Sequence, residues 1–203
     1  MVAATLDAPV PRTVPAGPLD EDARLAARGH AGDRAALRAI YETHRHAVGR
    51  HVLLLTGDPS CVDDLVQDTF LTAFGRLDRF DGSSRLRTFL VGIARNLARN
   101  HLAKARRRRR LLDAHRDQRP AVGSFAAAPD ETARGRQALA RLYAALDRLP
   151  AAQREAFVVR VLERRPLDEA AAILGAPVAT VSYRARKAET RVRAMLRDEG
   201  IES

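Results

Sequence analysis

The segment LDEAAAILGAPVATVSYRARKAETRVRAML, residues 167–196, contains the pattern that decides the fold of the C-terminal part of the chain. Small and apolar residues over 167–174 predict a short helix, and Gly-Ala-Pro at 175–177 predicts a tight turn. A longer helix is expected to begin at Val178. Two helices joined by a short turn that contains glycine are typical of a helix-turn-helix, whose second helix enters the major groove of DNA.

The outer face of this second helix is polar and basic. Val181 and Ala185 are four residues apart, which places both on the inward face. Between Arg184 and Arg197 the chain has six positive residues and one negative residue, Glu189, and such a stripe suits a phosphate backbone. A helical hairpin with a merely solvated basic face is the alternative. The outward positions are Ser182, Tyr183, Arg186 and Lys187.

The composition favours an all-α protein that binds a polyanion. The 203 residues include 35 Lys and Arg against 25 Asp and Glu, a formal net charge of +10, which indicates nucleic acid as a partner. Aromatic residues make up only 4% and Trp is absent, so Leu, Ile, Val and Ala must build the cores. Such cores favour helices over strands.

The single cysteine and the absence of long apolar runs indicate the compartment. With Cys61 as the single cysteine, we expect neither an internal disulfide nor a zinc cluster, which fits a reducing cytoplasm. We interpret it as incidental, with a redox sensor as the alternative. No apolar run reaches the roughly 18 residues that a membrane span needs, and the initial MVAATLDAPV lacks the features of a signal peptide. We therefore expect a cytoplasmic protein with no membrane insertion.

Proline, glycine and apolar periodicity divide the chain into four parts. Residues 1–19 contain four prolines and predict a disordered arm. Residues 20–110 have helical periodicity, residues 111–133 resemble a linker, and residues 134–203 form a smaller helical unit. The expected fold is therefore all-α, with two small helical domains joined by a flexible linker, the C-terminal one a helix-turn-helix.

Glycine and capping residues set the helix boundaries expected in the first domain. Two helices should be interrupted over 29–33, and the second should end near Thr56. Another helix is expected over about 60–77, and a further one should follow the sequence RFDGSS and bury Leu86, Phe89, Leu90, Ile93 and Leu97. For the helix over 60–77, the expected inward residues are Val62, Val66, Ala73, Phe74 and Leu77, and the opposite stripe comprises Asp64, Gln67, Asp68 and Leu71.

The stretch DDLVQDTF, residues 63–70, gathers three carboxylates and a glutamine in a cationic protein. A metal site, a solvated helix face and a docking surface for a basic partner are the three explanations. The nearby His44, His46 and His51 are not spaced to place three ligands on one face, and no His-Glu-x-x-His pattern occurs, so we expect surface histidines and no metal site. No nucleophile paired with a base and no phosphate-binding glycine loop is visible either.

Four stretches in this order resemble the extracytoplasmic-function group of bacterial sigma-70 family sigma factors. They are DDLVQDTF, then FDGSSRLRTFLVGIARNLARNHL, then LDRLPAAQREAFVVRVLE, and then the helix-turn-helix. The resemblance implies a non-enzymatic, cofactor-free subunit that directs promoter recognition, strand opening and transcription initiation by RNA polymerase. It further implies contacts with the clamp helices of the largest polymerase subunit and with the flap region, and in many relatives an anti-sigma factor as an inhibitor.

The resemblance also implies three sets of interface residues. Polymerase docking is expected of Asp64, Gln67, Asp68 and Phe70. Recognition and melting of the −10 element are expected of Asp81, Gly82, Ser83, Ser84, Arg85, Arg87, Phe89, Arg95, Asn96, Arg99 and Asn100, with Lys104 as a further phosphate contact. Duplex binding at the −35 element is expected of Thr180, Ser182, Tyr183, Arg184, Arg186 and Lys187.

Phe89 departs from the family pattern, since relatives usually have Trp at this position. Because Phe89 also falls on the apolar stripe of its helix, we favour a core residue over one that stacks on a base. The run of arginines that ends this helix, residues 106–110, contacts phosphates in one interpretation and is a solvated helix end in the other.

The cost of strand separation argues for a partner. Opening about ten base-pair steps costs on the order of 14 kcal/mol, whereas each captured base returns roughly 1 to 3 kcal/mol. A chain that captures one or two bases therefore needs polymerase to hold the rest of the single strand. The runner-up is a stand-alone helix-turn-helix regulator, and a nuclease is a third hypothesis.

Overall fold

The computed structural model describes residues 18–113 and 133–198, which we call the N-terminal and C-terminal halves. The N-terminal half contains α1 (Pro18–His30), α2 (Arg34–Thr56), the 3₁₀ turns η1 (Pro59–Cys61) and η2 (Leu77–Arg79), α3 (Val62–Phe74) and α4 (Leu86–Asp113). The C-terminal half contains α5 (Ala133–Asp147), α6 (Ala151–Phe157), the π-helical turn η3 (Val158–Leu162), α7 (Leu167–Leu174) and α8 (Val178–Asp198). Regular structure in these two halves is entirely helical, so the predicted all-α class is confirmed.

The helix boundaries follow the local capping chemistry. The Asp33 side chain accepts hydrogen bonds from the backbone N–H groups of Ala35 and Ala36 and starts α2. Gly57, at φ 71°, ends α2, and Gly175, at φ 58°, ends α7, each in the left-handed conformation that glycine adopts without strain. The predicted break over 29–33, the end of α2 at Thr56 and the bounds of both helix-turn-helix helices are therefore confirmed. The predicted arm and linker lie largely outside the described residues.

Helix α3 is shorter than predicted and buries a broader face. It covers Val62–Phe74, with the 3₁₀ turns η1 and η2 taking the ends of the expected range 60–77. Of the expected inward residues, Ala73 and Leu77 are buried as predicted, whereas Val62, Val66 and Phe74 are only half-buried. Because α3 packs against both α2 and α4, the buried face also includes Leu65, Thr69 and Phe70.

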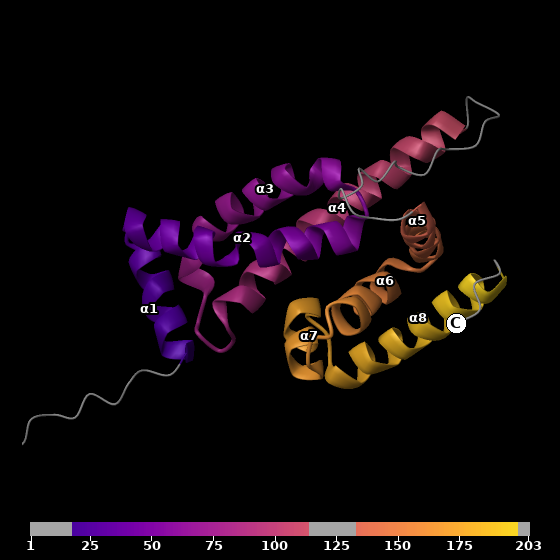
Figure 1. The fold of residues 1–203 in the computed structure, drawn as a ribbon. Coiled ribbons are helices and arrows are strands. Elements are labelled where there is room, and N and C mark those ends of the chain that lie inside the picture. The colour runs from indigo at the N-terminus through magenta and orange to yellow at the C-terminus, as the bar shows by residue number, and fades with distance from the viewer. Residues whose placement is uncertain (1–17, 114–132, 199–203) are drawn as a thin grey trace, which may run out of the picture.

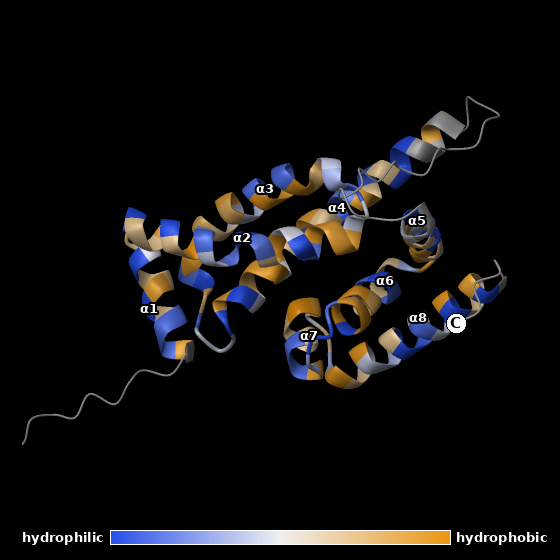
Figure 2. Ribbon diagram, viewed as in Figure 1, coloured by the Kyte–Doolittle hydropathy of each residue, from blue (hydrophilic) through white to orange (hydrophobic). Residues whose placement is uncertain are grey.

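The two halves pack against each other rather than standing apart (Figure 1). Helix α7 lies against α4, and η3 contacts α2. Val158 of η3 belongs to the apolar core of the N-terminal half, and Val91 of α4 belongs to the cluster that α6, α7 and α8 form. Figure 2 shows hydrophobic residues where α2, α3 and α4 face one another and where α6, α7 and α8 meet. None of the described helices is both long and apolar enough to cross a membrane.

Candidate polymerase and DNA interfaces

Helix α3 presents an acidic and amide stripe to solvent. We call the exposed residues Asp64, Gln67, Asp68 and Leu71 the α3 stripe; Leu71 is 63% exposed although it is apolar. Neither Asp64 nor Asp68 takes part in an ion pair within the described halves. Figure 1 shows α3 on the side of α2 and α4 that faces away from α6, α7 and α8. The stripe is therefore open to a partner in this arrangement.

Phe70 does not lie on the α3 stripe, although the sequence pattern predicts that it faces polymerase. Its side chain is only 3% exposed, and its ring packs edge-on against Tyr41 at 4.9 Å and against Phe74 at 5.8 Å between centroids. In this structure Phe70 supports the helix from within and does not offer a surface. Tyr41 of α2, which sequence reasoning missed, is 40% exposed beside it.

The loop before α4 is held in a defined shape. Asp81 accepts a hydrogen bond from Ser83 N at 2.9 Å, Gly82 adopts φ 72°, and the hydrogen bonds from Ser83 lower the pKa of Asp81. The N–H of Leu86, the first residue of α4, donates to the Asp22 carboxylate of α1 at 2.8 Å. Asp22 thus fixes the start of α4, a contact across 64 residues that local periodicity does not reveal.

The predicted −10 residues surround a groove of about 380 Å³. One wall is the loop before α4 and the first turns of α4, and the other is the end of α7. The first wall includes Asp81, Ser83, Ser84, Phe89, Arg95 and Asn96, and the second includes Ala172, Ile173 and Gly175. The structure therefore brings much of the predicted set together, but it places the C-terminal half against the same space.

Phe89 is half-buried and lies at the base of this groove. Its ring packs against Phe80 with 5.5 Å between centroids, and it contacts the core of the N-terminal half. The structure therefore agrees with the interpretation of Phe89 as a core residue, one edge of which reaches the groove.

Arg95 is occupied by the other half of the protein. Its guanidinium pairs with the Glu155 carboxylate of α6 at 2.7 Å, and the two side chains are only 13% and 6% exposed. The expected phosphate contact of Arg95 is thus blocked in this arrangement. Other side chains predicted to contact DNA are exposed. They are Arg85 in the loop before α4 and Arg87, Asn96, Arg99 and Asn100 on α4.

The C-terminal half also caps the end of α2. The Arg154 side chain, 1% exposed, donates to the carbonyl of Leu55 at 2.9 Å and to that of Thr56 at 3.2 Å, and it pairs with Asp147. The Tyr143 hydroxyl donates to the Leu53 carbonyl at 3.2 Å. The carbonyls of Leu55 and Thr56 belong to the last turn of α2, where carbonyls lack partners within the helix and carry the negative end of its dipole, whereas the Leu53 carbonyl also accepts from the Gly57 N–H. The buried Arg154 guanidinium donates hydrogen bonds to the Leu55 and Thr56 carbonyls and places a positive charge at the negative end of the dipole.

His51 is buried, which corrects the expectation that it lies at the surface. Its Nδ1 is 2.7 Å from the Glu163 carboxylate, and the two side chains are 1% and 4% exposed. Burial raises the pKa of Glu163, but the hydrogen bond and charge of His51, together with Arg165, outweigh it, so the net pKa lies below the usual value. Within the described halves, His51 Nε2 and Glu155 Oε1 have no hydrogen-bond partner.

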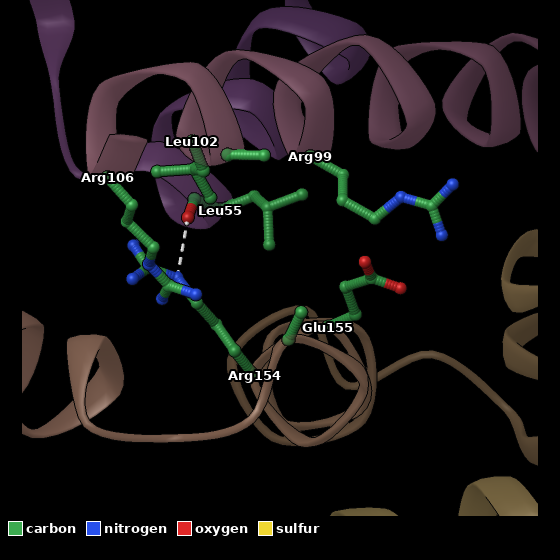
Figure 3. Close-up of a pocket in the computed structure, with 8 residues that line it drawn as sticks. Leu55, Arg99, Leu102, Arg106, Arg154 and Glu155 are labelled. Atoms are coloured by element: carbon green, nitrogen blue, oxygen red, sulfur yellow. Dashed lines mark hydrogen bonds between the residues drawn. The ribbon is translucent and has the colours of Figure 1, made fainter. Parts of the chain in front are cut away.

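The contact between the halves is incompletely packed. A cavity of about 60 Å³ lies between α4 and α6, beside the hydrogen bond from Arg154 to Leu55. Figure 3 shows the side chains that line it. Buried ion pairs repay their desolvation cost only when every polar atom is satisfied, and two are not. The polar part of this contact therefore adds little net stability, and the apolar contacts of Val158 and Val91 contribute the rest. The cavity is lined by Leu55, Arg99, Leu102, Ala103, Arg106, Ala151, Arg154 and Glu155.

Helix α8 presents its outer face freely. Val181 and Ala185 are buried as predicted, whereas Tyr183 is 58% exposed. The Lys187 ammonium donates to the Tyr183 hydroxyl at 3.1 Å, and Arg186 donates to the Ser182 hydroxyl at 3.2 Å. The exposed predicted residues are Tyr183, Arg186 and Lys187, while Thr180, Ser182 and Arg184 are half-buried.

Comparisons with known proteins give the family. Residues 40–108 match the Sigma-70 region 2 family, and residues 139–192 match the Sigma-70, region 4 family. The ECF RNA polymerase sigma factor SigC of Mycobacterium tuberculosis is 34% identical over 164 residues, which cover 81% of this chain and 85% of SigC. The chain therefore belongs to the sigma-70 family.

Solved structures agree with this assignment. One is CnrH, a sigma factor of Cupriavidus metallidurans, in complex with the cytosolic domain of CnrY; it is 28% identical, with a TM-score of 0.63, and the match covers 89% of this chain and all of CnrH. Another is the sigma factor RpoE in complex with the anti-sigma factor NepR from Bartonella quintana, 26% identical with a TM-score of 0.59 over 79% of this chain and 96% of that one. This chain is thus an RNA polymerase sigma factor of the extracytoplasmic-function group, acting in transcription initiation. The matches include the N-terminal half, so nothing in them favours a stand-alone helix-turn-helix regulator.

Proposed function

We propose that the α3 stripe is the surface that docks on the clamp helices of the largest polymerase subunit. Asp64 and Asp68 are exposed and without ion pairs in the described halves, and they complement the basic side chains of a partner while repelling DNA. Leu71 adds an exposed apolar contact to the same face. Phe70 contributes by holding α3 on Tyr41 and Phe74.

We infer that residues 20–110 recognise and open the −10 element. The groove beside the loop before α4 offers Asn96, whose amide provides both a donor and an acceptor for the edge of a splayed base. Arg99 and Asn100 are exposed further along the same helix and suit the adjacent backbone. The chain has no chemistry of its own in this proposal, because polymerase supplies catalysis.

The outer face of α8, within residues 134–203, is proposed to read the −35 duplex. Tyr183, Arg186 and Lys187 project from the early turns of the second helix, which is the part of a helix-turn-helix that meets base edges. The flap region of polymerase is the proposed support for this half. A cytoplasmic location follows from this partnership with polymerase and DNA.

The described arrangement is proposed to be a closed form that opens before −10 DNA binds. The observation that carries this is the Arg95–Glu155 ion pair at 2.7 Å, because it occupies a predicted phosphate contact from within the protein. The end of α7 also forms one wall of the groove that the base would enter. Docking through the α3 stripe needs no opening, so polymerase binding precedes DNA binding in this scheme.

An anti-sigma factor is a further proposed partner. The neighbouring structures of CnrH and of RpoE are complexes, the second with a protein named as an anti-sigma factor. A partner that holds the halves in the closed form would inhibit initiation.

The proposal is tested by a pull-down with core polymerase. Asp68→Arg reverses a charge at the centre of the α3 stripe and is expected to abolish binding, while helicity remains at the wild-type level. Asp63→Arg makes the same charge change on an exposed residue of α3 outside the stripe and should leave binding nearly intact. Undiminished binding by Asp68→Arg would refute the docking surface.

A further inference from the structure

Three side chains with metal-binding atoms meet where the α2–α3 connection touches α4. They are Asp58, Cys61 and His101, and one ligand atom from each lies within 4.8 Å of the other two. Cys61 is buried, and Asp58 and His101 are half-buried. None of the three belongs to the surfaces proposed for polymerase or DNA.

The local structure of the turn η1 brings the first two ligands together. Asp58 caps this turn through Oδ1, which accepts from Ser60 N at 2.9 Å and from Ser60 Oγ at 2.6 Å. Three residues later, Cys61 Sγ donates to the Asp58 carbonyl at 3.2 Å, so the thiol folds back toward the cap. Oδ2 of Asp58 has no hydrogen-bond partner in the described halves and is left for another ligand.

His101 supplies the third ligand from a separate helix. It lies on α4 beside Leu102, which packs on the core of the N-terminal half, so the backbone position is fixed. In the described part of the chain, the His101 ring forms no hydrogen bond, unlike the buried His51. Forty residues separate Cys61 from His101, which explains why spacing along the sequence does not reveal the cluster.

The donor set selects the metal. Zinc binds thiolate sulfur at about 2.3 Å and imidazole nitrogen or carboxylate oxygen at about 2.0 to 2.2 Å, with tetrahedral geometry. Ligand atoms in such a site are roughly 3.3 to 3.6 Å apart, so the present separations, all within 4.8 Å, need to shorten by about 1 Å at most. Mg²⁺ and Ca²⁺ prefer oxygen ligands only.

We propose that Asp58, Cys61 and His101 bind a Zn²⁺ ion, with water as the fourth ligand, and that the ion ties α4 to the α2–α3 connection. Binding turns the Cys61 thiol into a thiolate and releases its proton to solvent. Asp58 lies two residues after Thr56, and its backbone N–H donates to Thr56 Oγ1 at 3.2 Å. The carbonyl of Thr56 accepts a hydrogen bond from Arg154 of the C-terminal half. The ion would therefore also brace the end of α2 that the C-terminal half caps.

Tag-free, full-length protein stripped with a chelator provides the test. Titration with Zn²⁺ against a chromophoric competitor should show one equivalent bound with a Kd of about 1 µM or tighter. Co²⁺ in place of zinc should give the visible bands of a tetrahedral site together with a thiolate-to-cobalt charge-transfer band. Zinc should raise the Tm of the wild-type protein, since it binds the folded state.

Two variants and one control decide the assignment. Cys61→Ser should remove the charge-transfer band, and His101→Gln should weaken zinc binding by at least about 10-fold and abolish the Tm shift. His46→Gln, which removes an exposed histidine of α2, should change neither. If Cys61→Ser fails to fold by circular dichroism, the half-buried His101→Gln still gives a result. Absence of micromolar zinc binding, or wild-type binding in His101→Gln, would overturn the proposal.

Discussion

The α3 stripe and the proposed DNA face of α4 belong to the same half of the protein, yet the first is fully open and the second is partly covered. Asp64 and Asp68 face solvent on the side away from α6, α7 and α8. Arg95 of α4 is paired with Glu155, and the groove beside the loop before α4 is walled by α7. The difference supports the proposed order of events, in which polymerase docks on the closed form and the −10 element binds after the halves separate.

The largest effect on this comparison is expected from Arg154→Met. The change removes the ion pair with Asp147 and both hydrogen bonds to the last carbonyls of α2, and each buried acceptor left unsatisfied costs about 1 to 3 kcal/mol. Urea unfolding should show the loss, and small-angle scattering should show a larger radius of gyration for the folded variant. Arg148→Met, at an exposed position, is the control. A variant as compact and as stable as the wild type would show that this contact does not hold the halves together.

Two variants that break the same ion pair should have opposite effects on DNA binding. Glu155→Gln releases Arg95 and opens the groove, so the affinity for a non-template −10 oligonucleotide should rise by several-fold. Arg95→Ala breaks the same contact but removes the phosphate ligand, so the affinity should fall. Fluorescence anisotropy measures both.

The control variant makes the same Glu-to-Gln change at a site away from the groove. Glu42→Gln removes a carboxylate from the exposed pair with Arg38 on α2 and should leave the affinity unchanged. Parallel changes in Glu155→Gln and Arg95→Ala would contradict the idea that Glu155 competes with DNA for Arg95.

A more moderate loss is expected on α8, whose outer face is open in both forms. Arg186→Ala should cost about 1 to 3 kcal/mol in holoenzyme binding to a duplex −35 element, as expected for a base-contacting arginine. Arg193→Ala, on the same helix but paired with Glu189, should cost less. Equal losses would indicate that α8 contributes only general charge.

The smallest effect concerns pH and the contact of Glu163 with His51. The pKa of Glu163 is lower in the closed form than its ordinary value of about 4.3, so its contribution to closure is complete above that value and is lost as the pH falls through the lowered pKa. Acidification from about pH 6 to about pH 3 should therefore separate the two halves of the wild-type protein. Small-angle scattering would show this as a larger radius of gyration. Glu163→Gln should open with a weaker dependence on pH; an identical dependence would assign the opening to other carboxyl groups.

Sequence predicted those features that depend on neighbouring residues. The break between α1 and α2, the glycines that end α2 and α7, and the buried face of α8 all follow from local turn residues and periodicity. The same reasoning failed for part of the inward face of α3, because helix periodicity does not tell which of two adjacent stripes a second packing helix will cover: Val66 is only half-buried, whereas Leu65 is buried.

Contacts between the halves could not be foreseen for a related reason. His51 and Glu163 are 112 residues apart, and Arg154 reaches the end of α2 across 99 residues. Each residue taken alone is an ordinary polar residue of a helix. Only the pairing across the chain gives it a role, and the pairing depends on how the two halves pack against each other.

The central claim, a closed form that opens on polymerase, is tested most directly by energy transfer between the halves. Dyes would be attached at the exposed positions His46 and Arg197, one on α2 and one on α8, in a chain whose own Cys61 is buried. We predict high transfer in the free protein and low transfer once core polymerase is added without DNA, with no decrease in Asp68→Arg. Low transfer in the free protein, or high transfer that persists in a holoenzyme active in transcription, would contradict it.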